Sequence, residues 1–338
     1  MITENEILEQ PSMFQKCISE YKNLVSSVKE DLLRKKYSEI GFVGCGSSYY
    51  LAMGLAFNIA RLSKGRIKTK AYTGSELAFD LNKINEGSLL IGISRSGEST
   101  ETLYALKKTK STTNATTIAV TCTPNSKLEE EADHSISMNF INEESIVMTK
   151  SFTSMAFIIS VLFQDILDNG YLDYSEMIFN SSKIILDKMH NEIEIDIKNI
   201  DHFVFLGYDE YFAASMEGLI KVTEMSLSEV NSFPTLEFRH GPKSKVNDKT
   251  LSVILPNPVM LQKEIEIADE LSKLGANVLI ISPKKTNNFK YVAFPYGRDD
   301  FSDWFLRVIP LQLLGLKKAV SKGLNPDSPK NLGKVVKF

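Results

Sequence analysis

Three serines in one short loop are the residues of this chain best suited to bind an anion. Ser94, Ser96 and Ser99 follow an apolar run at 89–93 and precede a segment with helical periodicity. A strand that ends in this way places hydroxyls and free backbone N–H groups at a helix N-terminus, where the helix dipole is positive. The arrangement favours a dianion such as a phosphate monoester. On these residues alone, a serine-rich turn that only caps its helix is an equal alternative.

The kind of phosphate follows from the rest of the loop. No Gly-Lys-Ser or Gly-Lys-Thr follows the loop glycine, Gly97, so the pattern differs from the phosphate loop of nucleotide-binding proteins. No hydroxyl that would bind a magnesium ion is implied either. The loop therefore indicates a sugar phosphate rather than a magnesium nucleotide.

Two further segments carry groups that could move protons. Glu217, Lys221 and Glu224 have i, i+4, i+7 spacing and share one face of a predicted helix. Such a face is either a solvated row of ion pairs or, because its neighbours are apolar, the wall of a cleft. His240 ends a short helical segment before Gly241, where an imidazole could protonate or deprotonate a bound group near neutral pH. The other histidines are expected to be structural: His134, His190 and His202.

Hydroxyls also gather where a long apolar helix is predicted to begin, near residue 150. Thr149, Ser151 and Thr153 lie there, and Thr153 is expected to serve as a capping residue.

The C-terminal tail, 325–338, contains two prolines and several apolar residues, which indicates that it packs against the protein. The apolar residues are Leu332, Val335 and Val336.

Composition excludes several classes of protein. A net charge of −3 over 338 residues argues against a nucleic-acid-binding surface. The first residues are polar and acidic, unlike a signal peptide, and no apolar run approaches the ~20 residues that span a bilayer. The three cysteines form no CxxC pair, which argues against a disulfide framework or a zinc site. We therefore expect a cytoplasmic protein with neither nucleic-acid nor membrane partners.

An internal repeat must position the candidate groups. Residues 42–52 and 205–214 each begin as an apolar strand that ends in Gly and continue through an aromatic pair into a helix. The strand predicted at 89–93 corresponds to 251–255, and 115–120 corresponds to 276–281. Strands that alternate with helices predict parallel sheets. The fold class expected is α/β, with two tandem doubly wound parallel-sheet domains of flavodoxin-like topology.

The predicted domain limits follow from this repeat. A helical stretch from residue 150 to about 194, with a break at Gly170 and Tyr171, joins the two copies. We expect an N-terminal helical segment, two domains, a helical linker between them, and a tail that closes the active site. In chain order, the N-terminal segment is 1–36, the first domain 37–170, the linker 171–196, the second domain 197–324 and the tail 325–338.

Only the first copy is predicted to hold a phosphate. Where it has the serine loop 94–99, the second copy has 255–260, with two prolines and no serine. In open α/β sheets, ligands bind beyond the carboxyl ends of the strands, so loop 44–48 should join loop 94–99 in one crevice. Its glycines would let the backbone approach the ligand, and Ser48 is expected to cap the following helix.

At these segments the sequence resembles the sugar isomerase (SIS) family, and within it the two-domain deaminases of amino-sugar phosphates. The resemblance extends from about residue 30 to residue 338. The segments that carry it are 43–48, 94–99, 149–153, 217–224, 238–243 and 326–334.

The resemblance implies roles for individual residues. Glu224 would be the base that moves a proton between C1 and C2 of the open-chain sugar. His240, supplied by the neighbouring subunit of a homodimer, would assist ring opening, while Lys334 would approach C2 and could form an imine. Lys221 would lie near the sugar hydroxyls. The remaining residues that would hold the sugar and its phosphate are Gly46, Ser47, Ser48, Ser94, Arg95, Ser96, Ser99 and Thr149.

Two departures from the family's synthases shift the expected reaction. Those enzymes carry an N-terminal amidotransferase domain with a cysteine after the initiator Met, whereas this chain has Ile2 and a first predicted strand after about 40 residues. They also have Gln at the position of Arg95 and Ser at the position of Met148. The resemblance therefore implies deamination of glucosamine 6-phosphate to fructose 6-phosphate and ammonia, without a metal or organic cofactor. The alternatives are a galactosamine 6-phosphate substrate, a fructosamine-6-phosphate deglycase or another isomerase, and a sensor of sugar phosphates without catalytic activity.

Overall fold

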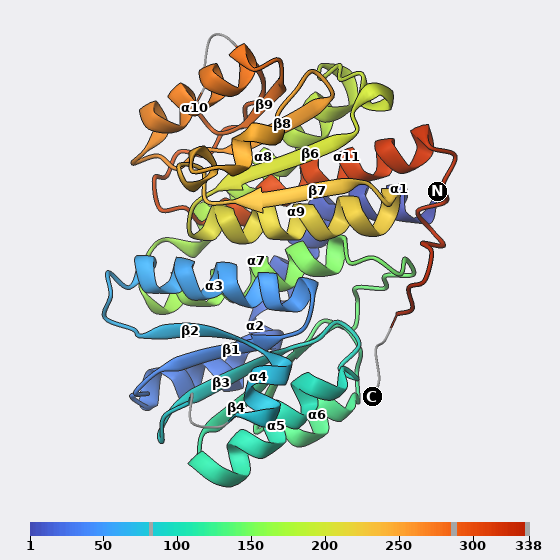
Figure 1. The fold of residues 1–338 in the computed structure, drawn as a ribbon. Coiled ribbons are helices and arrows are strands. Elements are labelled where there is room, and N and C mark those ends of the chain that lie inside the picture. The colour runs from blue at the N-terminus through green and yellow to red at the C-terminus, as the bar shows by residue number, and fades with distance from the viewer. Residues whose placement is uncertain (81–83, 285–288, 335–338) are drawn as a thin grey trace. The chain divides into compact units, whose positions relative to one another are not determined.

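The computed structural model describes residues 1–80, 84–284 and 289–334, and it divides into two compact units. The β1–β5 unit comprises Ser12–Glu144, Lys150–Glu176 and the start of the tail at Gly333 and Lys334. The β6–β10 unit comprises Met1–Pro11, Ser145–Thr149 and Met177–Leu332. Each unit contains one parallel sheet with helices packed against it (Figure 1).

The sheet of the β1–β5 unit has the strand order β2-β1-β3-β4-β5, and every neighbouring pair is parallel. Its central strands are fully buried apolar runs, as expected for a sheet covered on both faces. Helix α3 packs on β1 and β2, and α5 packs on β3. The strands are β1 (Ile40–Gly44), β2 (Thr69–Thr73), β3 (Leu89–Ile93), β4 (Thr116–Thr121) and β5 (His134–Ser137). The helices are α2 (Gln10–Arg34), α3 (Ser47–Leu62), α4 (Gly74–Phe79), α5 (Thr100–Thr113), α6 (Lys127–Glu131) and α7 (Lys150–Ile166).

The sheet of the β6–β10 unit has the order β10-β9-β8-β6-β7 and is also parallel throughout. Helix α9 packs on β6 and β7 and against α11, while α10 packs on β8 and β9. The strands are β6 (His202–Gly207), β7 (Glu229–Phe233), β8 (Thr250–Leu255), β9 (Asn277–Ile281) and β10 (Lys290–Val292). The helices are α1 (Ile2–Leu8), α9 (Glu210–Ser226), α10 (Leu261–Lys273) and α11 (Val308–Ser321), and the 3-10 helices are η2 (Ile197–Asn199), η3 (Glu237–Arg239), η4 (Pro242–Lys245) and η5 (Trp304–Arg307). Helix α8 (Tyr171–Asn191) contains the point at residue 176 where the chain passes from one unit to the other.

The two sheets have the same topology, which confirms the predicted repeat. In each, the first strand lies between the second and third, and the fourth and fifth follow on the side of the third. The strand order therefore reverses beside β1 in one sheet and beside β6 in the other. Crevices at such switch points, beyond the carboxyl ends of the strands, are where open α/β sheets bind ligands.

Most predicted elements are confirmed, with one correction at a helix cap. The predicted strands appear as β3, β4, β8 and β9, and the break in the long helical stretch falls between the end of α7 at Ile166 and the start of α8 at Tyr171. Ser48 doesn't cap α3: the N-cap is Gly46, with φ of 55°, and Ser48 lies inside the first turn. Glycine takes this left-handed conformation without strain, so the helix begins two residues earlier than predicted.

The predicted domain boundaries stay a prediction. Val335 and Val336, and the rest of 335–338, lie outside the described residues. In the described part of the chain, every helix is too short or too polar to cross a bilayer.

Candidate active-site residues

The serine loop after β3 is shaped by its own hydroxyls. The Ser94 hydroxyl accepts a hydrogen bond from the Gly97 N–H at 3.1 Å and lies 3.0 Å from the Ser99 hydroxyl. The Glu98 N–H donates to the Ser96 hydroxyl at 3.2 Å. Ser99 is the N-cap of α5, yet its side chain makes no capping hydrogen bond. Three hydroxyls thus stand at the positive end of a helix of 14 residues, an arrangement suited to an anion.

The loop after β1 contacts α5, the helix that follows the serine loop. Strands β1 and β3 are hydrogen-bonded neighbours, so both loops leave the sheet at one edge. The sulfur of Cys45 lies 3.5 Å from the Thr102 hydroxyl in the first turn of α5. A Cβ on Gly44 would stand 2.6 Å from the Ser48 backbone, so only glycine permits this approach. Ser47 and Ser48 are both buried.

Arg95 forms an ion pair that the sequence analysis missed. Its Nη1 lies 2.9 Å from the carboxylate of Glu143, and the side chains are 12% and 1% exposed respectively. Glu143 also accepts hydrogen bonds from the N–H and the hydroxyl of Ser151, at the start of α7. Burial alone would raise the pKa of Glu143, but the Arg95 guanidinium and the Ser151 donors outweigh it and lower the pKa. The carboxylate is therefore ionised at neutral pH.

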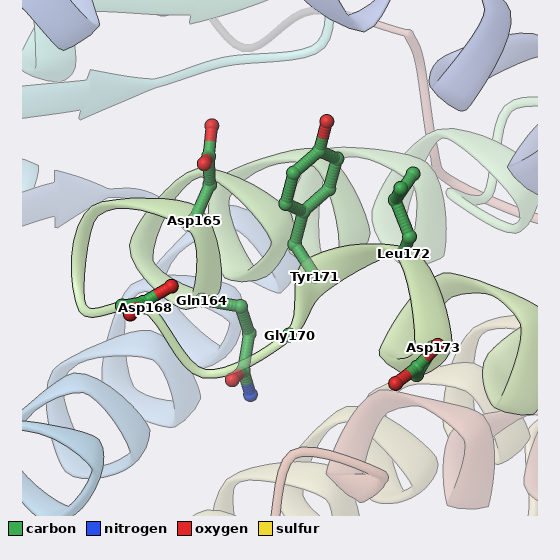
Figure 2. A pocket seen from close by; sticks show the side chains of 7 residues that line it. All are labelled: Gln164, Asp165, Asp168, Gly170, Tyr171, Leu172 and Asp173. Atoms are coloured by element: carbon green, nitrogen blue, oxygen red, sulfur yellow. The ribbon is translucent and has the colours of Figure 1, made fainter.

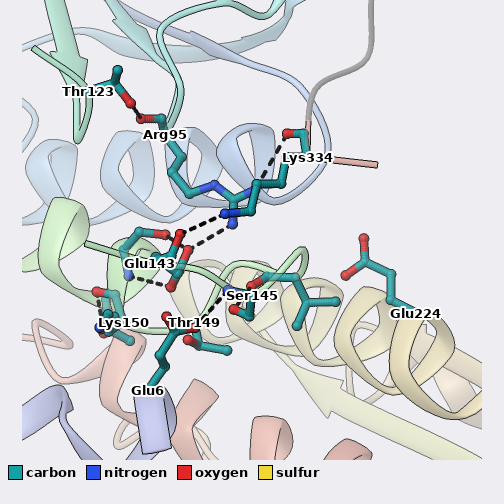
Figure 3. A network of polar contacts seen from close by, with 12 residues as sticks. Glu6, Arg95, Thr123, Glu143, Ser145, Thr149, Lys150, Glu224 and Lys334 are labelled. Atoms are coloured by element: carbon teal, nitrogen blue, oxygen red, sulfur yellow. Dashed lines mark hydrogen bonds and ion pairs between the residues drawn. The ribbon is translucent and has the colours of Figure 1, made fainter. Parts of the chain in front are cut away.

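The tail lysine belongs to the same cluster. The Nζ of Lys334 donates to the backbone carbonyl of Glu143 at 3.3 Å, and the Nη2 of Arg95 donates to the backbone carbonyl of Lys334 at 3.5 Å. Figure 3 shows Lys334 beside the Arg95–Glu143 pair. A signal for Glu143 did exist in the sequence: an arginine that replaces a neutral residue near a sheet edge needs an acidic partner if it is buried.

In the β6–β10 unit, Glu217, Lys221 and Glu224 share one face of α9, as predicted. The Nζ of Lys221 lies 2.7 Å from the Glu224 carboxylate and 3.5 Å from that of Glu217. Lys221 and Glu217 are fully buried, whereas the side chain of Glu224 is 20% exposed. The face is therefore not a solvated row of ion pairs. The partly exposed carboxylate of this triad is the one that can meet a ligand.

His240 ends the 3-10 helix η3 and is exposed. Gly241, with φ of 120°, turns the chain directly after it. The neighbouring Arg239 and Lys243 both pair with Glu270 of α10, which fixes the loop on either side of the histidine. By contrast, the buried His202 has its Nε2 at 2.9 Å from Asn231, in line with the structural role expected for it.

The start of the tail packs against the N-terminal helix through Asp327, whereas Leu332, one of the apolar residues on which the predicted packing rested, is exposed. Asp327 accepts hydrogen bonds from the backbone N–H groups of Ile2 and Thr3 at the start of α1. Thr149 is buried in the β6–β10 unit, where its carbonyl accepts a hydrogen bond from Gln312 at 3.3 Å.

The predicted residues therefore fall into two groups. Those in the β1–β5 unit are Gly46, Ser47, Ser48, Ser94, Arg95, Ser96, Ser99 and Lys334, and those in the β6–β10 unit are Thr149, Lys221, Glu224 and His240. Over the described ranges, no cluster of three His, Cys, Asp or Glu side chains has the geometry to hold a metal ion.

In the second copy, the side chain of Glu264 binds loop 255–260, the segment that corresponds to the serine loop of the first copy. The Glu264 carboxylate of α10 accepts hydrogen bonds from the Asn257 N–H at 2.5 Å and from the Thr235 hydroxyl at 2.6 Å. Because Glu264 is buried, its pKa is raised to about 7 despite these donors. The Asn257 N–H of loop 255–260 is thus already hydrogen-bonded to Glu264.

The turn between α7 and α8 holds a pocket of about 310 Å³ in which acidic residues gather (Figure 2). Asp165 there is bound by Lys29 and by the Tyr21 hydroxyl. Asp168 and Asp173 add further negative charge, which would repel a phosphate. This pocket is lined by none of the predicted site residues; its lining is Gln164, Asp165, Asp168, Gly170, Tyr171, Leu172 and Asp173.

Comparisons with known proteins identify the family of the chain and its fold. Residues 32–164 match the model of the SIS domain. The structure resembles that of a glucosamine-6-phosphate deaminase from Thermotoga maritima, with a TM-score of 0.80 and 34% identity over 99% of both chains. It also resembles the C-terminal domain of a glucosamine-fructose-6-phosphate aminotransferase from Francisella tularensis, with a TM-score of 0.82 and 25% identity over 97% of this chain and 98% of that one.

A curated relative extends the comparison to a longer protein. The glutamine–fructose-6-phosphate aminotransferase of Francisella tularensis is 28% identical over 324 residues, which is 90% of this chain and 52% of that protein. The chain thus spans about half the length of the curated relatives it matches. With 34% identity to the Thermotoga deaminase across 99% of both chains, and an SIS match that covers the serine loop, this chain belongs to the SIS domain family.

Proposed function

We propose that this protein is an SIS sugar-phosphate isomerase that deaminates glucosamine 6-phosphate. The observation that carries the proposal is the 34% identity, over 99% of both chains, to a protein described as a glucosamine-6-phosphate deaminase. The serine loop at the N-terminus of α5 supports it independently, because hydroxyls at a helix start suit a phosphate monoester.

In this proposal the phosphate is held by the two loops that leave the β1–β5 sheet at one edge. The hydroxyls of Ser94, Ser96 and Ser99 donate to the phosphate oxygens, with Ser48 as a fourth donor. The α5 dipole adds a favourable interaction of about 0.3–1 kcal/mol with the negative charge. Neither a metal nor an organic cofactor enters the proposed reaction.

Glu224 is the proposed base. With the ring opened by His240, the carboxylate removes the proton from C2 while O1 is protonated, which gives an enolamine. Glu224 then returns the proton to C1, the nitrogen gives up one N–H proton in exchange for the proton taken up at O1, and the product is an imine at C2. Lys221, 2.7 Å from Glu224, forms an ion pair with the carboxylate and so fixes its position for proton transfer.

The imine at C2 is the group from which ammonia is released. Water adds to C2, the nitrogen takes up a proton and leaves as ammonia, and the ketone of fructose 6-phosphate remains. Alternatively, the amine of Lys334 adds to C2 and expels ammonia, and water then hydrolyses the resulting lysine imine to the ketone and the free amine. Both routes have the same overall balance of one water consumed and one ammonia released.

The test is ammonia release from purified protein with glucosamine 6-phosphate and galactosamine 6-phosphate in parallel, without glutamine. We expect turnover of the gluco isomer. Turnover of the galacto isomer alone would reassign the substrate. Binding without release from either sugar would favour the deglycase, the plain isomerase or the sensor, and fructosamine 6-phosphate is then the next substrate to assay.

A matched pair of serine variants tests the phosphate site. Ser99→Ala removes one donor to a dianion and should weaken inorganic phosphate binding about 10- to 100-fold. Ser111→Ala, at the other end of α5, removes only an exposed hydroxyl bonded to the Lys108 carbonyl and should leave binding unchanged. Equal affinities for the two variants would exclude the serine loop as the phosphate site.

A further inference from the structure

The proposed reaction leaves one well-ordered feature of the β1–β5 unit without a role. Glu143 is almost fully buried and ionised, and it is bound by Arg95 and by the N–H and hydroxyl of Ser151, yet no step of the reaction uses it. Its contacts lead directly to Lys334, the tail residue assigned to chemistry at C2 (Figure 3).

The two residues that contact Lys334, Glu143 and Arg95, are themselves hydrogen-bonded to helix α7 and to the end of strand β4. The Glu143 carboxylate is bound at the start of α7 by the N–H of Ser151, at 3.0 Å, and by its hydroxyl. The Arg95 carbonyl accepts hydrogen bonds from the Cys122 N–H at 3.0 Å and the Thr121 hydroxyl at 3.1 Å, at the end of β4. Glu143 and Arg95 thus join two framework elements through a 2.9 Å ion pair.

Lys334 is exposed, and it is held by this pair at two points. Its backbone carbonyl accepts a hydrogen bond from Arg95, and its Nζ donates to the backbone carbonyl of Glu143. The acceptor of the amine is a neutral carbonyl rather than a carboxylate. The amine can therefore leave it for a sugar carbon without breaking an ion pair, while the main chain stays bound to Arg95.

We propose that Glu143 is a positioning residue that, through Arg95 and through its own carbonyl, holds the tail so that Lys334 can act at C2. The contacts stand on their own, whereas the chemical purpose rests on the proposed function. The Glu143 carboxylate holds Arg95, and Arg95 binds the tail, so the loss of either side chain weakens the hold on Lys334.

Trypsin digestion of the full chain measures how firmly Lys334 is held, because the protease can cleave after this lysine only when its side chain has left its contacts. Lys330 and Lys334 lie in the same tail, and Lys330 serves as the internal reference. In Glu143→Gln the ratio of cleavage after Lys334 to cleavage after Lys330, measured by intact mass, should rise several-fold over the wild type. Glu144→Gln is the matched control, since it removes the neighbouring exposed carboxylate and should leave the ratio unchanged.

Arg95→Gln is the second variant and keeps the test independent of folding defects. It leaves Glu143 with both donors of Ser151, so the buried carboxylate stays hydrogen-bonded. We expect the same rise in cleavage after Lys334, with melting curves that show a folded protein. An unchanged cleavage ratio in both folded variants would overturn the proposal.

Kinetics then separates positioning from a general structural role. For ammonia release, Glu143→Gln should lose at least tenfold in kcat with KM and phosphate affinity close to wild type, because Glu143 lies outside the serine loop 94–99. A rise in KM alone would assign the pair to substrate binding and contradict the proposal. If the wild type releases no ammonia while the cleavage ratios shift as expected, the deaminase function fails and the tail contact stands.

Discussion

A buried lysine between two carboxylates is the arrangement on which the proposed proton transfer depends. Lys221 is fully buried and within 3.5 Å of Glu217 and 2.7 Å of Glu224. Its charge outside water is tolerated because both carboxylates compensate it. Only Glu224 retains partial exposure, so one carboxylate neutralises the lysine internally and the other is available for chemistry. The different exposure of the two carboxylates therefore assigns charge compensation to Glu217 and proton transfer to Glu224.

Glu224→Gln tests that division. An amide of the same size cannot accept the C2 proton, so kcat for ammonia release should fall at least about 100-fold. Phosphate binding should persist, because the serine loop is unaltered. The control is Glu266→Gln, which changes a carboxylate that is 40% exposed and paired with Lys263 on α10, and it should leave turnover unchanged. Retained activity in Glu224→Gln would remove Glu224 as the base.

At the scale of elements, the phosphate loop depends on one glycine conformation. Gly97 has φ of 65°, and a Cβ there would lie 2.1 Å from the Ser126 hydroxyl, ahead of α6. Its N–H also donates to Ser94, so the turn that orients the serines passes through this residue. The loop is therefore shaped by packing between α5 and α6 as well as by its own hydroxyls.

Gly97→Ala and Gly87→Ala form a matched pair for this argument. Gly87 has φ of 70° but open space around its Cβ position, so alanine there costs only the left-handed backbone, about 1–2 kcal/mol. At Gly97 the clash with Ser126 adds to that cost and displaces the serines. We expect Gly97→Ala to lower both the melting temperature and phosphate affinity, and Gly87→Ala to lower only the former. Equal phosphate affinities in calorimetry would show that the loop tolerates the displacement.

At the scale of the whole molecule, the sequence predicted the repeated strand–helix units. It did not predict the ion pairs and hydrogen bonds between residues that are distant in sequence. Apolar runs that end in glycine or serine sufficed for the order of strands and helices, and so for two sheets of one topology. A buried Arg95 implies an acidic partner, but the sequence does not show which one, because Glu143 is distant in sequence and meets Arg95 only through folding. Nor could the local spacing around Glu264 reveal that its carboxylate binds the Asn257 N–H.

The buried Glu264 makes stability of the β6–β10 unit depend on pH. Its folded pKa, about 7, lies above the ordinary value of 4.5, and the adjacent groups are Thr235, Asn257 and Arg307. Below pH 4.5 both states are protonated and the contribution is fully present. As pH rises to about 7, only the unfolded state loses its proton, so the free energy of unfolding falls by about 3 kcal/mol.

Glu264→Gln should remove most of this dependence. The amide resembles the protonated acid: its oxygen can accept from the Asn257 N–H and its nitrogen can donate to the Thr235 hydroxyl. Urea unfolding at pH 5 and pH 8 can be followed by Trp304, the single tryptophan, which is fully buried in this unit. We expect the difference between the two pH values to shrink by about 2–3 kcal/mol relative to wild type, and to be unchanged in the control variant Glu266→Gln. A wild-type pH dependence that Glu264→Gln fails to reduce would mean that Glu264 is ionised in the folded protein across this range.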